Sequence, residues 1–400
     1  MTGLRVSLLA LGVAVAASAL FPGCSSDAVT FDETMGPPPA EGAGGEGDDG
    51  AAGGETTGAG GSGGEGVWTP PDGDPIEAEA LTWTFIEFPE SRCRDGSSTG
   101  IGVSLNPESN RVMIFLEGGG ACFNRLTCAA NPSSFDSEDF DGFDGGLFDR
   151  DNEDNPVADY NFVYVPYCTG DVHAGDNPAG VVEGLGEQMF VGYANMRLYL
   201  DRVVPTFLEA DKVLLTGISA GGFGAFATAD LVQRTFGPTE VVVLDDSGPP
   251  MRPPALASCL QEEWRTLWGL DNTVLADCGA NCQDSSDFLV DFALHLTDTY
   301  PNNHFGLFSR RADSVIRTFY GAGRNECAGG LTPISEDDFT DGLDGFRTEV
   351  EGRNFGTYYQ NGSQHTVLRS DGLYRTEVGE VPLTTWIADL LEGRTSNVSP

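Results

Sequence analysis

The sequence is poor in basic residues, and in lysine most of all. Its 400 residues include 21 Lys and Arg against 61 Asp and Glu, which gives a formal net charge of -40, and Lys212 is the single lysine. Nucleic acid is therefore excluded as a partner class, because phosphate binding requires a basic face. Direct docking on anionic lipid headgroups is disfavoured for the same reason. The scarcity of lysine also nearly excludes Schiff-base catalysis.

The sequence also lacks an apolar run long enough to cross a membrane comfortably, which takes about 20 residues. The run at 6–20, preceded by Arg5, is typical of a secretory signal. Two processing sites compete: cleavage after Ala19, or a lipoprotein box that makes Cys24 the lipidated first residue. Lipid on Cys24 would leave eight of the nine cysteines, an even number that suits disulfide bonds in an oxidising compartment. We therefore predict a signal peptide at 1–23 and a lipid anchor on Cys24, in a secreted or cell-surface bacterial envelope protein.

Apolar periodicity is missing from residues 24–80, which are rich in glycine and in acidic residues. A segment without apolar side chains to bury stays solvated, so we interpret it as a disordered tether that follows the lipidated cysteine. From about Leu81 the pattern changes, and the 24 phenylalanines of the chain can supply a core. We predict one globular domain over 81–400, a monomer joined to the membrane only through the N-terminal lipid.

Short apolar runs alternate with helical stretches through this predicted domain. The runs at 111–116, 161–165, 212–216, 240–244 and 304–309 are apolar throughout, as strands buried on both faces are. Helical patterns cover 187–210, 220–236, 284–299 and 382–391. The alternation predicts an α/β fold with a mostly parallel central sheet and helices on both faces. Ligands of such sheets bind at the carboxyl ends of the strands.

The clearest catalytic motif is Gly217-Ile218-Ser219-Ala220-Gly221-Gly222, which follows one of these strands and opens a helix. A serine at such a turn has a strained backbone that exposes its hydroxyl above the sheet, and small neighbours make the strain tolerable. The start of the helix adds free N–H groups and a positive dipole. We predict that Ser219 is a nucleophile. The alternative is a close crossing of strand and helix without chemistry.

A serine nucleophile needs a base, and the chain contains four histidines. Only His365 lies near the C-terminus after a plausible acid, in the order serine, acid, histidine that sheets of this kind use. We predict His365 as the general base. Asp313, which follows the strand at 304–309 and precedes a helix start, is the predicted orienting acid. Asp246, at the end of an earlier strand, is the alternative acid.

A glycine-rich segment at 117–122 follows the strand at 111–116. Consecutive glycines allow backbone N–H groups to approach a ligand oxygen closely. We predict an oxyanion hole from the N–H groups of Gly119, Gly120, Ala121 and Ala220. The segment lacks the G-x-G-x-x-G spacing of a dinucleotide site, and we predict no organic cofactor and no metal. The acidic stretch at 136–159 keeps bound calcium as an alternative, although it does not meet the EF-hand register.

The order of these motifs resembles that of a known family. FLEGGGAC at 115–122, YCTGD at 167–171, LTGISAGG at 215–222, LDDSG at 244–248 and ADS at 312–314 are similar to motifs of the pectin acetylesterase/Notum family of secreted α/β-hydrolase-like carboxylesterases. The resemblance extends over about 92–367. It implies the triad Ser219, Asp313 and His365 and oxyanion donors near Gly120. It also implies that Cys93 pairs with Cys168.

The remaining cysteines are less well determined by the sequence. Cys122 and Cys128 are close enough in sequence to close a short loop. Cys259, Cys278, Cys282 and Cys327 have no connectivity that the sequence fixes. The even count predicts four disulfides in all.

The resemblance predicts an extracellular serine carboxylesterase that removes O-acetyl groups from polysaccharide. The acidic domain disfavours a strongly anionic polymer, within the reach that salt screening allows, and leaves a neutral acetylated glycan, a lipid ester and an acylated protein open. The chain has Ala121 where the family has tryptophan, so we expect a wider or differently lined pocket wall. A Notum-like deacylase of lipid or protein acyl esters is one alternative, and a non-catalytic surface-binding lipoprotein is another.

Overall fold

The computed structural model describes residues 68–283, 286–328 and 330–400. The predicted signal peptide, Cys24 and most of the predicted tether lie outside the described residues. Within 68–80 the chain already packs on the domain: Ile76 is buried and its N–H donates to Thr206 Oγ1 at 2.7 Å. Trp68 Nε1 donates to the carbonyl of Thr235. The described residues before the predicted boundary at 81 thus already contact the domain, because Ile76 is an apolar side chain that the domain buries.

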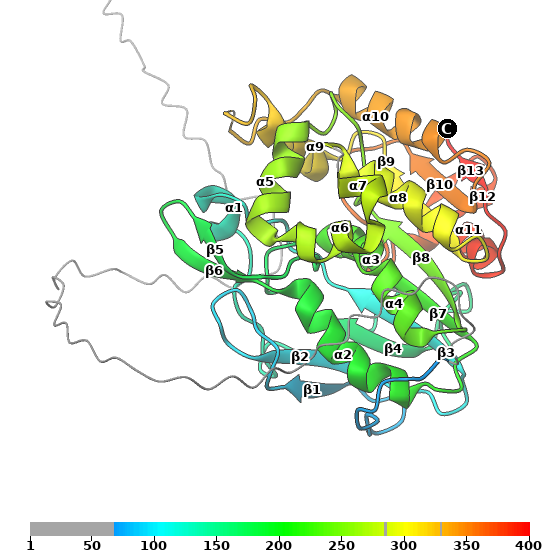
Figure 1. The fold of residues 1–400 in the computed structure, drawn as a ribbon. Coiled ribbons are helices and arrows are strands. Elements are labelled where there is room, and N and C mark those ends of the chain that lie inside the picture. The colour runs from blue at the N-terminus through cyan, green and yellow to red at the C-terminus, as the bar shows by residue number, and fades with distance from the viewer. Residues whose placement is uncertain (1–67, 284–285, 329) are drawn as a thin grey trace, which may run out of the picture. The chain divides into compact units, whose positions relative to one another are not determined.

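A nine-stranded sheet forms the centre of this unit, in the order β1-β2-β4-β3-β7-β8-β9-β10-β13 (Figure 1). The strands are β1 (Thr84–Phe88), β2 (Thr99–Ser104), β3 (Arg111–Leu116), β4 (Asn161–Val165), β7 (Lys212–Ile218), β8 (Glu240–Asp246), β9 (His304–Arg310), β10 (Phe355–Gln360) and β13 (Asn397–Val398). β2 pairs antiparallel with β1 and with β4, and the other pairs are parallel. The five strands predicted from apolar runs are confirmed and occupy the middle of the sheet.

Each central strand buries both of its faces, which is why its sequence is apolar without alternation. In β3, Val112 and Ile114 contribute to one hydrophobic core, and Met113 and Phe115 contribute to the other. Successive side chains of a strand point to opposite faces, so one apolar run supplies both cores. The prediction of a mostly parallel sheet covered on both faces is confirmed.

The helices cover the two faces unequally. The larger core packs side chains from helices α1 to α10, and the smaller core packs α11 with irregular segments (Figure 1). The helices are α1 (Arg125–Ala129), α2 (Gly192–Thr206), α3 (Ala220–Ala227), α4 (Ala229–Phe236), α5 (Ser258–Trp268), α6 (Val274–Cys278), α7 (Ala280–Gln283), α8 (Phe288–Thr299), α9 (Ser314–Tyr320), α10 (Glu336–Glu349) and α11 (Leu383–Leu391). Short 3-10 turns lie at η1 (Gly146–Phe148), η2 (Leu270–Asn272), η3 (Gly321–Gly323) and η4 (Leu373–Arg375).

Three predicted helices differ from the structure. The helix predicted over 284–299 begins at Phe288 as α8. The helix predicted over 187–210 begins only at Gly192, because 186–190 form strand β6 (Gly186–Phe190), which pairs with β5 (Asn177–Val182) and buries Phe190. The helix predicted over 220–236 is divided at Thr228 into α3 and α4. A second small hairpin joins β11 (Glu377–Val378) and β12 (Val381–Pro382).

The acidic stretch at 136–159 lies against the smaller core through its aromatic side chains. Phe140, Phe143 and Phe148 each make ring contacts with Trp83 at centroid distances between 5.4 and 5.7 Å. Among the described residues, no group of three or more His, Cys, Asp or Glu is arranged to hold a metal ion, so the calcium alternative gains no support. In the part of the chain that the structure describes, no helix has the length and apolarity that a membrane crossing requires.

Four disulfides join the described cysteines. Cys93 pairs with Cys168 and Cys122 with Cys128, as expected, and the structure adds the pairs Cys259–Cys327 and Cys278–Cys282. All eight cysteines that remain after Cys24 are therefore used. This pairing fits an oxidising compartment.

Candidate active site

Ser219 occupies a tight turn between the end of β7 and the start of α3. Its φ angle is +56°, a left-handed conformation that a residue with a side chain adopts only under strain. The turn packs directly on β3: a methyl group at Gly221 would lie 2.0 Å from the carbonyl oxygen of Leu116. A methyl group at Gly217 would lie 2.3 Å from the carbonyl oxygen of Gly221. The glycines of the motif are therefore required by backbone contact, as the sequence suggested.

Asp313 and His365 form a hydrogen-bonded pair. His365 Nδ1 lies 2.7 Å from Asp313 Oδ2, and the Asp313 side chain is completely buried. The other carboxylate oxygen of Asp313 accepts from the N–H groups of Val315 and Ile316, at 2.9 and 3.1 Å, and thereby caps α9. With Nδ1–H donating to the carboxylate, Nε2 of the neutral ring is an acceptor. Nε2 is buried and has no hydrogen-bond partner within the described residues.

The loop that carries His365 is fastened to the segment that carries Asp313. The carbonyl of Gly362 accepts from the N–H of Ala312, and the carbonyl of Ser363 accepts from the N–H of Ser314, both at 3.0 Å. β9 and β10 are parallel neighbours, so the two segments leave the sheet at the same edge. The fold thus brings residues 313 and 365 together at the carboxyl ends of adjacent strands, where ligands of such sheets bind.

Asp246, the alternative acid, makes no hydrogen bond to the imidazole of His365. It is the last residue of β8, and its carbonyl accepts from the N–H of Ser219 at 2.7 Å. Its carboxylate accepts from the N–H of Val367, two residues after His365. Asp246 is therefore hydrogen-bonded both to the turn of Ser219 and to the loop of His365, so that a single residue connects these two elements. Asp313 is the carboxylate that contacts the ring.

The segment after β3 passes beside Ser219. A methyl group at Gly118 would lie 3.1 Å from Ser219 Cβ. Within the described chain, the N–H groups of Gly119, Gly120, Ala121 and Ala220 donate no hydrogen bond. Gly120, Ala121 and Ala220 line the same pocket as Ser219, whereas Gly119 is outside that lining. Three of the four residues predicted as oxyanion donors thus line the pocket that contains Ser219.

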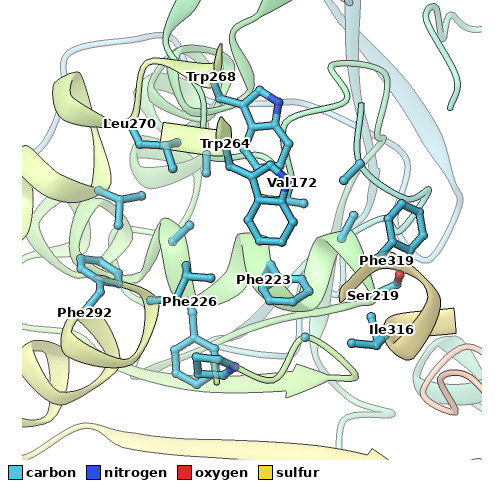
Figure 2. A pocket seen from close by; sticks show the side chains of 18 of the residues that line it. Val172, Ser219, Phe223, Phe226, Trp264, Trp268, Leu270, Phe292, Ile316 and Phe319 are labelled. Carbon is cyan, nitrogen blue, oxygen red and sulfur yellow. The ribbon is translucent and has the colours of Figure 1, made fainter. Parts of the chain in front are cut away.

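A deep apolar pocket opens at Ser219. Helices α3, α5, α6, α8 and α9 supply its walls, and Figure 2 shows aromatic and aliphatic side chains between Ser219 at one end and Phe292 and Leu270 at the other. No charged side chain of the described residues lines it. The larger lining side chains are Val172, Phe223, Phe226, Trp264, Trp268, Leu270, Val274, Phe288, Leu289, Phe292, Ile316, Phe319 and Tyr320. Ala121, where the resemblance led us to expect a differently lined wall, is one of the lining residues.

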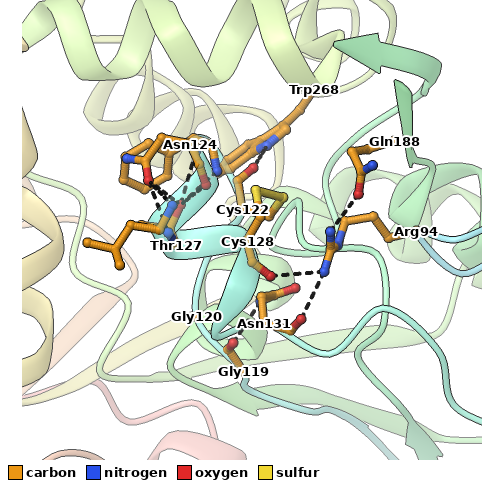
Figure 3. The surroundings of a disulfide bond; sticks show 12 residues. Arg94, Gly119, Gly120, Cys122, Asn124, Thr127, Cys128, Asn131, Gln188 and Trp268 are labelled. Atoms are coloured by element: carbon orange, nitrogen blue, oxygen red, sulfur yellow. Dashed lines mark hydrogen bonds between the residues drawn. A yellow bond between two sulfur atoms is a disulfide. The ribbon is translucent and has the colours of Figure 1, made fainter. Parts of the chain in front are cut away.

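The Cys122–Cys128 disulfide braces the segment that carries the free N–H groups (Figure 3). The carbonyl of Cys122 accepts from Trp268 Nε1 at 3.0 Å, and its N–H donates to the carbonyl of Gly170 at 2.7 Å. Asn131 Nδ2 donates to the carbonyl of Gly119 at 2.7 Å. Trp268 also lines the pocket, whereas Asn131 is outside its lining. Sequence reasoning missed Asn131 and Trp268, because neither belongs to a motif.

Two ionisable groups, the partly exposed Glu117 and the buried His173, lie at the start of the same segment. The Glu117 carboxylate accepts from the N–H of Tyr167, while burial raises the pKa of Glu117. His173 Nε2 lies 2.9 Å from the carbonyl of Glu117, and burial lowers the pKa of His173 to about 4. A neutral imidazole donates to this carbonyl without carrying charge. His173 therefore supports the segment as a structural residue.

Comparisons with known proteins agree with the fold and the motifs. The pectinacetylesterase family model matches residues 76–287. The palmitoleoyl-protein carboxylesterase NOTUM of Schmidtea mediterranea is 33% identical over 162 residues, which cover 37% of this chain and 30% of that protein. NOTUM of Homo sapiens is 32% identical over 150 residues, which cover 36% of this chain and 30% of that protein. The match thus spans less than a third of the length of these relatives.

A solved structure described as the Wnt deacylase Notum from Drosophila superposes with a TM-score of 0.60. The superposition covers 80% of this chain and 96% of that one at 19% identity. At this identity the likeness shows a shared α/β-hydrolase-like fold.

Proposed function

The chain belongs to the pectinacetylesterase family, and on that premise we propose that it is an extracellular serine carboxylesterase. The observation that carries the proposal is the buried Asp313–His365 pair, with a nitrogen to oxygen distance of 2.7 Å. This pair leaves Nε2 of His365 as an unpartnered acceptor at the edge of the sheet where Ser219 stands in its strained turn. Serine, aspartate and histidine in these roles are the groups that acyl transfer requires.

The proposed reaction has two halves. His365 Nε2 takes the proton of Ser219 as the hydroxyl oxygen attacks the ester carbonyl, and Asp313 stabilises the imidazolium that forms. The carbon–oxygen bond to the alcohol then breaks, and the leaving alcohol takes the proton from His365. A water molecule, deprotonated by His365, cleaves the acyl-enzyme and regenerates Ser219.

The negative oxygen of each tetrahedral intermediate needs preorganised donors. The free N–H groups of Gly120, Ala121 and Ala220 are proposed for this role, with Gly119 supporting their segment from outside the pocket lining. The N–H of Ala220 also lies at the start of α3, where the helix dipole favours negative charge. Removal of one such donor typically costs about 3 kcal/mol of transition-state stabilisation.

The pocket favours an ester with an apolar acyl chain as the substrate. Its aromatic and aliphatic lining has no charged side chain among the described residues, so it offers favourable burial to methylene groups and little to sugar hydroxyls. The names of the curated relatives, palmitoleoyl-protein carboxylesterases, fit this substrate class. The second candidate is an O-acetylated polysaccharide, as predicted from the sequence, and the description of the matched family favours it.

Hydrolysis of chromogenic p-nitrophenyl esters from acetyl to dodecanoyl tests both parts of the proposal. We expect Ser219→Ala to lose hydrolysis by at least about 1000-fold, and a fluorophosphonate to label the wild type at Ser219. Ser109→Ala is the matched control, because Ser109 lies before β3 at the opposite end of the strands. Unchanged hydrolysis in Ser219→Ala, or no labelling, would reject the enzyme and favour a surface-binding protein. A maximum of kcat/KM at acetyl would favour the glycan.

Export and anchoring complete the proposal. The four disulfides suit an oxidising compartment, and the apolar run at 6–20 supplies a signal. We retain lipidation of Cys24 and a monomeric state as proposals. Mass spectrometry of the N-terminal peptide distinguishes a lipid on Cys24 from cleavage after Ala19.

A further inference from the structure

Asp246 connects the turn of the nucleophile with the loop of the base through three hydrogen bonds. Its main-chain carbonyl accepts from the N–H of Ser219 at 2.7 Å. Its Oδ2 accepts from the N–H groups of Val367 and Leu368, at 2.6 and 2.9 Å. Its Oδ1 accepts from Ser247 Oγ at 2.8 Å. The side chain is completely buried.

The position of Asp246 in the sheet explains how one residue reaches both elements. β8 lies between β7 and β9, and Asp246 pairs with Ile218 on one side and Phe308 on the other. Ile218 is the residue before Ser219. Asp246 therefore stands between the strand that presents the nucleophile and the strand that leads to Asp313.

The bonds to the loop act two residues beyond the imidazole. Thr366 separates His365 from Val367 and has a left-handed φ of +59°, and the buried side chains of Val367 and Leu368 follow. The ring of His365 is fixed at Nδ1 by Asp313, and the main chain before it is bonded to Ala312 and Ser314. The Asp246 carboxylate binds the main chain that follows the ring, at Val367 and Leu368.

The charged groups around Asp246 come from several elements. His365 faces it from the loop, Asp245 precedes it in β8, and Arg310 approaches from β9. Arg310 also donates to the carbonyl of Thr366, at 3.3 Å. Both oxygens of Asp246 are used by donors of the protein itself. The carboxylate is thus engaged in internal hydrogen bonds.

We propose that Asp246 is a positioning residue for ester hydrolysis, which sets the separation of Ser219 and His365 by holding the turn of one and the loop of the other. The inference rests on the proposed function and extends it to a residue that is not part of the triad. A displacement of about 1 Å between reacting groups can cost roughly 100-fold in rate. Loss of this link is therefore expected to lower kcat more than it raises KM.

Asp246→Ala removes the link. We expect kcat to fall by about 10- to 100-fold, KM to stay within about threefold, and labelling of Ser219 by a fluorophosphonate to slow in parallel with kcat. Asp230→Ala is the matched control: Asp230 is a buried carboxylate of α4, hydrogen-bonded to Arg234 and Tyr300 and outside the pocket lining. We expect it to lower the melting temperature and to leave kcat unchanged.

Two further variants separate geometry from charge and remain informative if Asp246→Ala does not fold. Asp246→Asn keeps an oxygen that can accept from both N–H groups and an amide that can donate to Ser247, so we expect kcat within about threefold of wild type. Asp246→Glu keeps the charge but moves the carboxylate oxygens by the length of one methylene group in a closed space. We therefore expect a lower kcat for Asp246→Glu than for Asp246→Asn. The reverse order, with Asn inactive and Glu active, would overturn positioning in favour of an electrostatic role.

Ser219→Ala, measured in the same assay, separates the two proposals. If Ser219→Ala abolishes hydrolysis while Asp246→Ala keeps the wild-type kcat, the positioning role is wrong and the esterase stands. If Ser219→Ala remains fully active, the proposed function itself is wrong.

Discussion

Nδ1 of His365 lies 2.7 Å from Oδ2 of Asp313, a residue 52 positions earlier in the chain. The carboxylate is completely buried, and its other oxygen caps α9. The same side chain therefore orients the proposed base and begins a helix. This double use allows a substitution that disturbs one role and preserves the other.

Asp313→Asn is expected to keep the helix cap, because its amide oxygen can accept from the N–H groups of Val315 and Ile316. Its NH₂ group would instead donate to Nδ1 of His365, so that Nε2 would carry the proton and could not accept one from Ser219. We expect kcat to fall by about 1000-fold or more with little change in melting temperature. Asp246→Asn, for which we expect only a small loss of kcat, is the control variant. Equal losses of kcat in Asp313→Asn and Asp246→Asn would contradict the assignment of Asp313 as the acid.

The far end of the apolar pocket should control acyl length. Leu270→Trp adds volume there, and we expect kcat/KM for dodecanoyl esters to fall at least about 10-fold while that for acetyl esters stays within about threefold. Leu208→Trp is the control, because Leu208 is half exposed and lies outside this pocket. The ester series of increasing chain length measures the effect. Equal losses for short and long esters would mean that the chain does not enter this pocket.

The turn of Ser219 should not tolerate a side chain at Gly221. A methyl group there would lie 2.0 Å from the main-chain oxygen of Leu116, in a strand that cannot move aside. We expect Gly221→Ala to lower the free energy of unfolding by about 3 kcal/mol or more. Gly345→Ala, in α10 with open space around the added carbon, is expected to raise it by about 0.5 to 1 kcal/mol. Urea titrations of both variants measure these changes, and a stable, active Gly221→Ala protein would refute the packing described for the turn.

The buried His173 leads us to expect that the free energy of unfolding depends on pH in a specific way. In the unfolded chain its pKa is near 6.5, whereas burial lowers the pKa to about 4 in the folded protein. The unfolded state therefore binds more protons between these values, and this group's contribution to the free energy of unfolding falls as the pH drops from 6.5 to 4. The full loss is about 3 kcal/mol.

His173→Gln isolates this contribution, since glutamine can donate to the carbonyl of Glu117 without titrating. Burial raises the pKa of Glu117 and of Asp171, so these groups act in the opposite direction in both proteins. We would measure the free energy of unfolding of wild type and variant by urea denaturation at pH 7 and at pH 4. Subtracting the two proteins at each pH cancels the contributions of Glu117 and Asp171. Curves that stay parallel across this range would show that folding does not shift the pKa of His173.

Local patterns determined the elements that form the middle of the sheet. A strand buried on both faces must be apolar at every position, so β3, β4, β7, β8 and β9 could be recognised from short apolar runs. The motif around Ser219 could be recognised because a strained turn in contact with a strand restricts its neighbours to small residues. β10 was not among the predicted strands, and β6 was mistaken for the start of a helix, since its five residues show no alternation and only pairing with β5 defines them.

The sequence by itself determined which chemical groups are available: one serine in a glycine-flanked turn, one histidine late in the chain, and eight cysteines suited to disulfides. Only the tertiary structure decided between Asp313 and Asp246, because both follow central strands and their distances to His365 depend on how the loops fold back. It also decided the apolar character of the pocket, whose walls come from five helices. Side chains far apart in sequence share a surface only after the sheet fixes where each strand ends, and no local pattern carries that information.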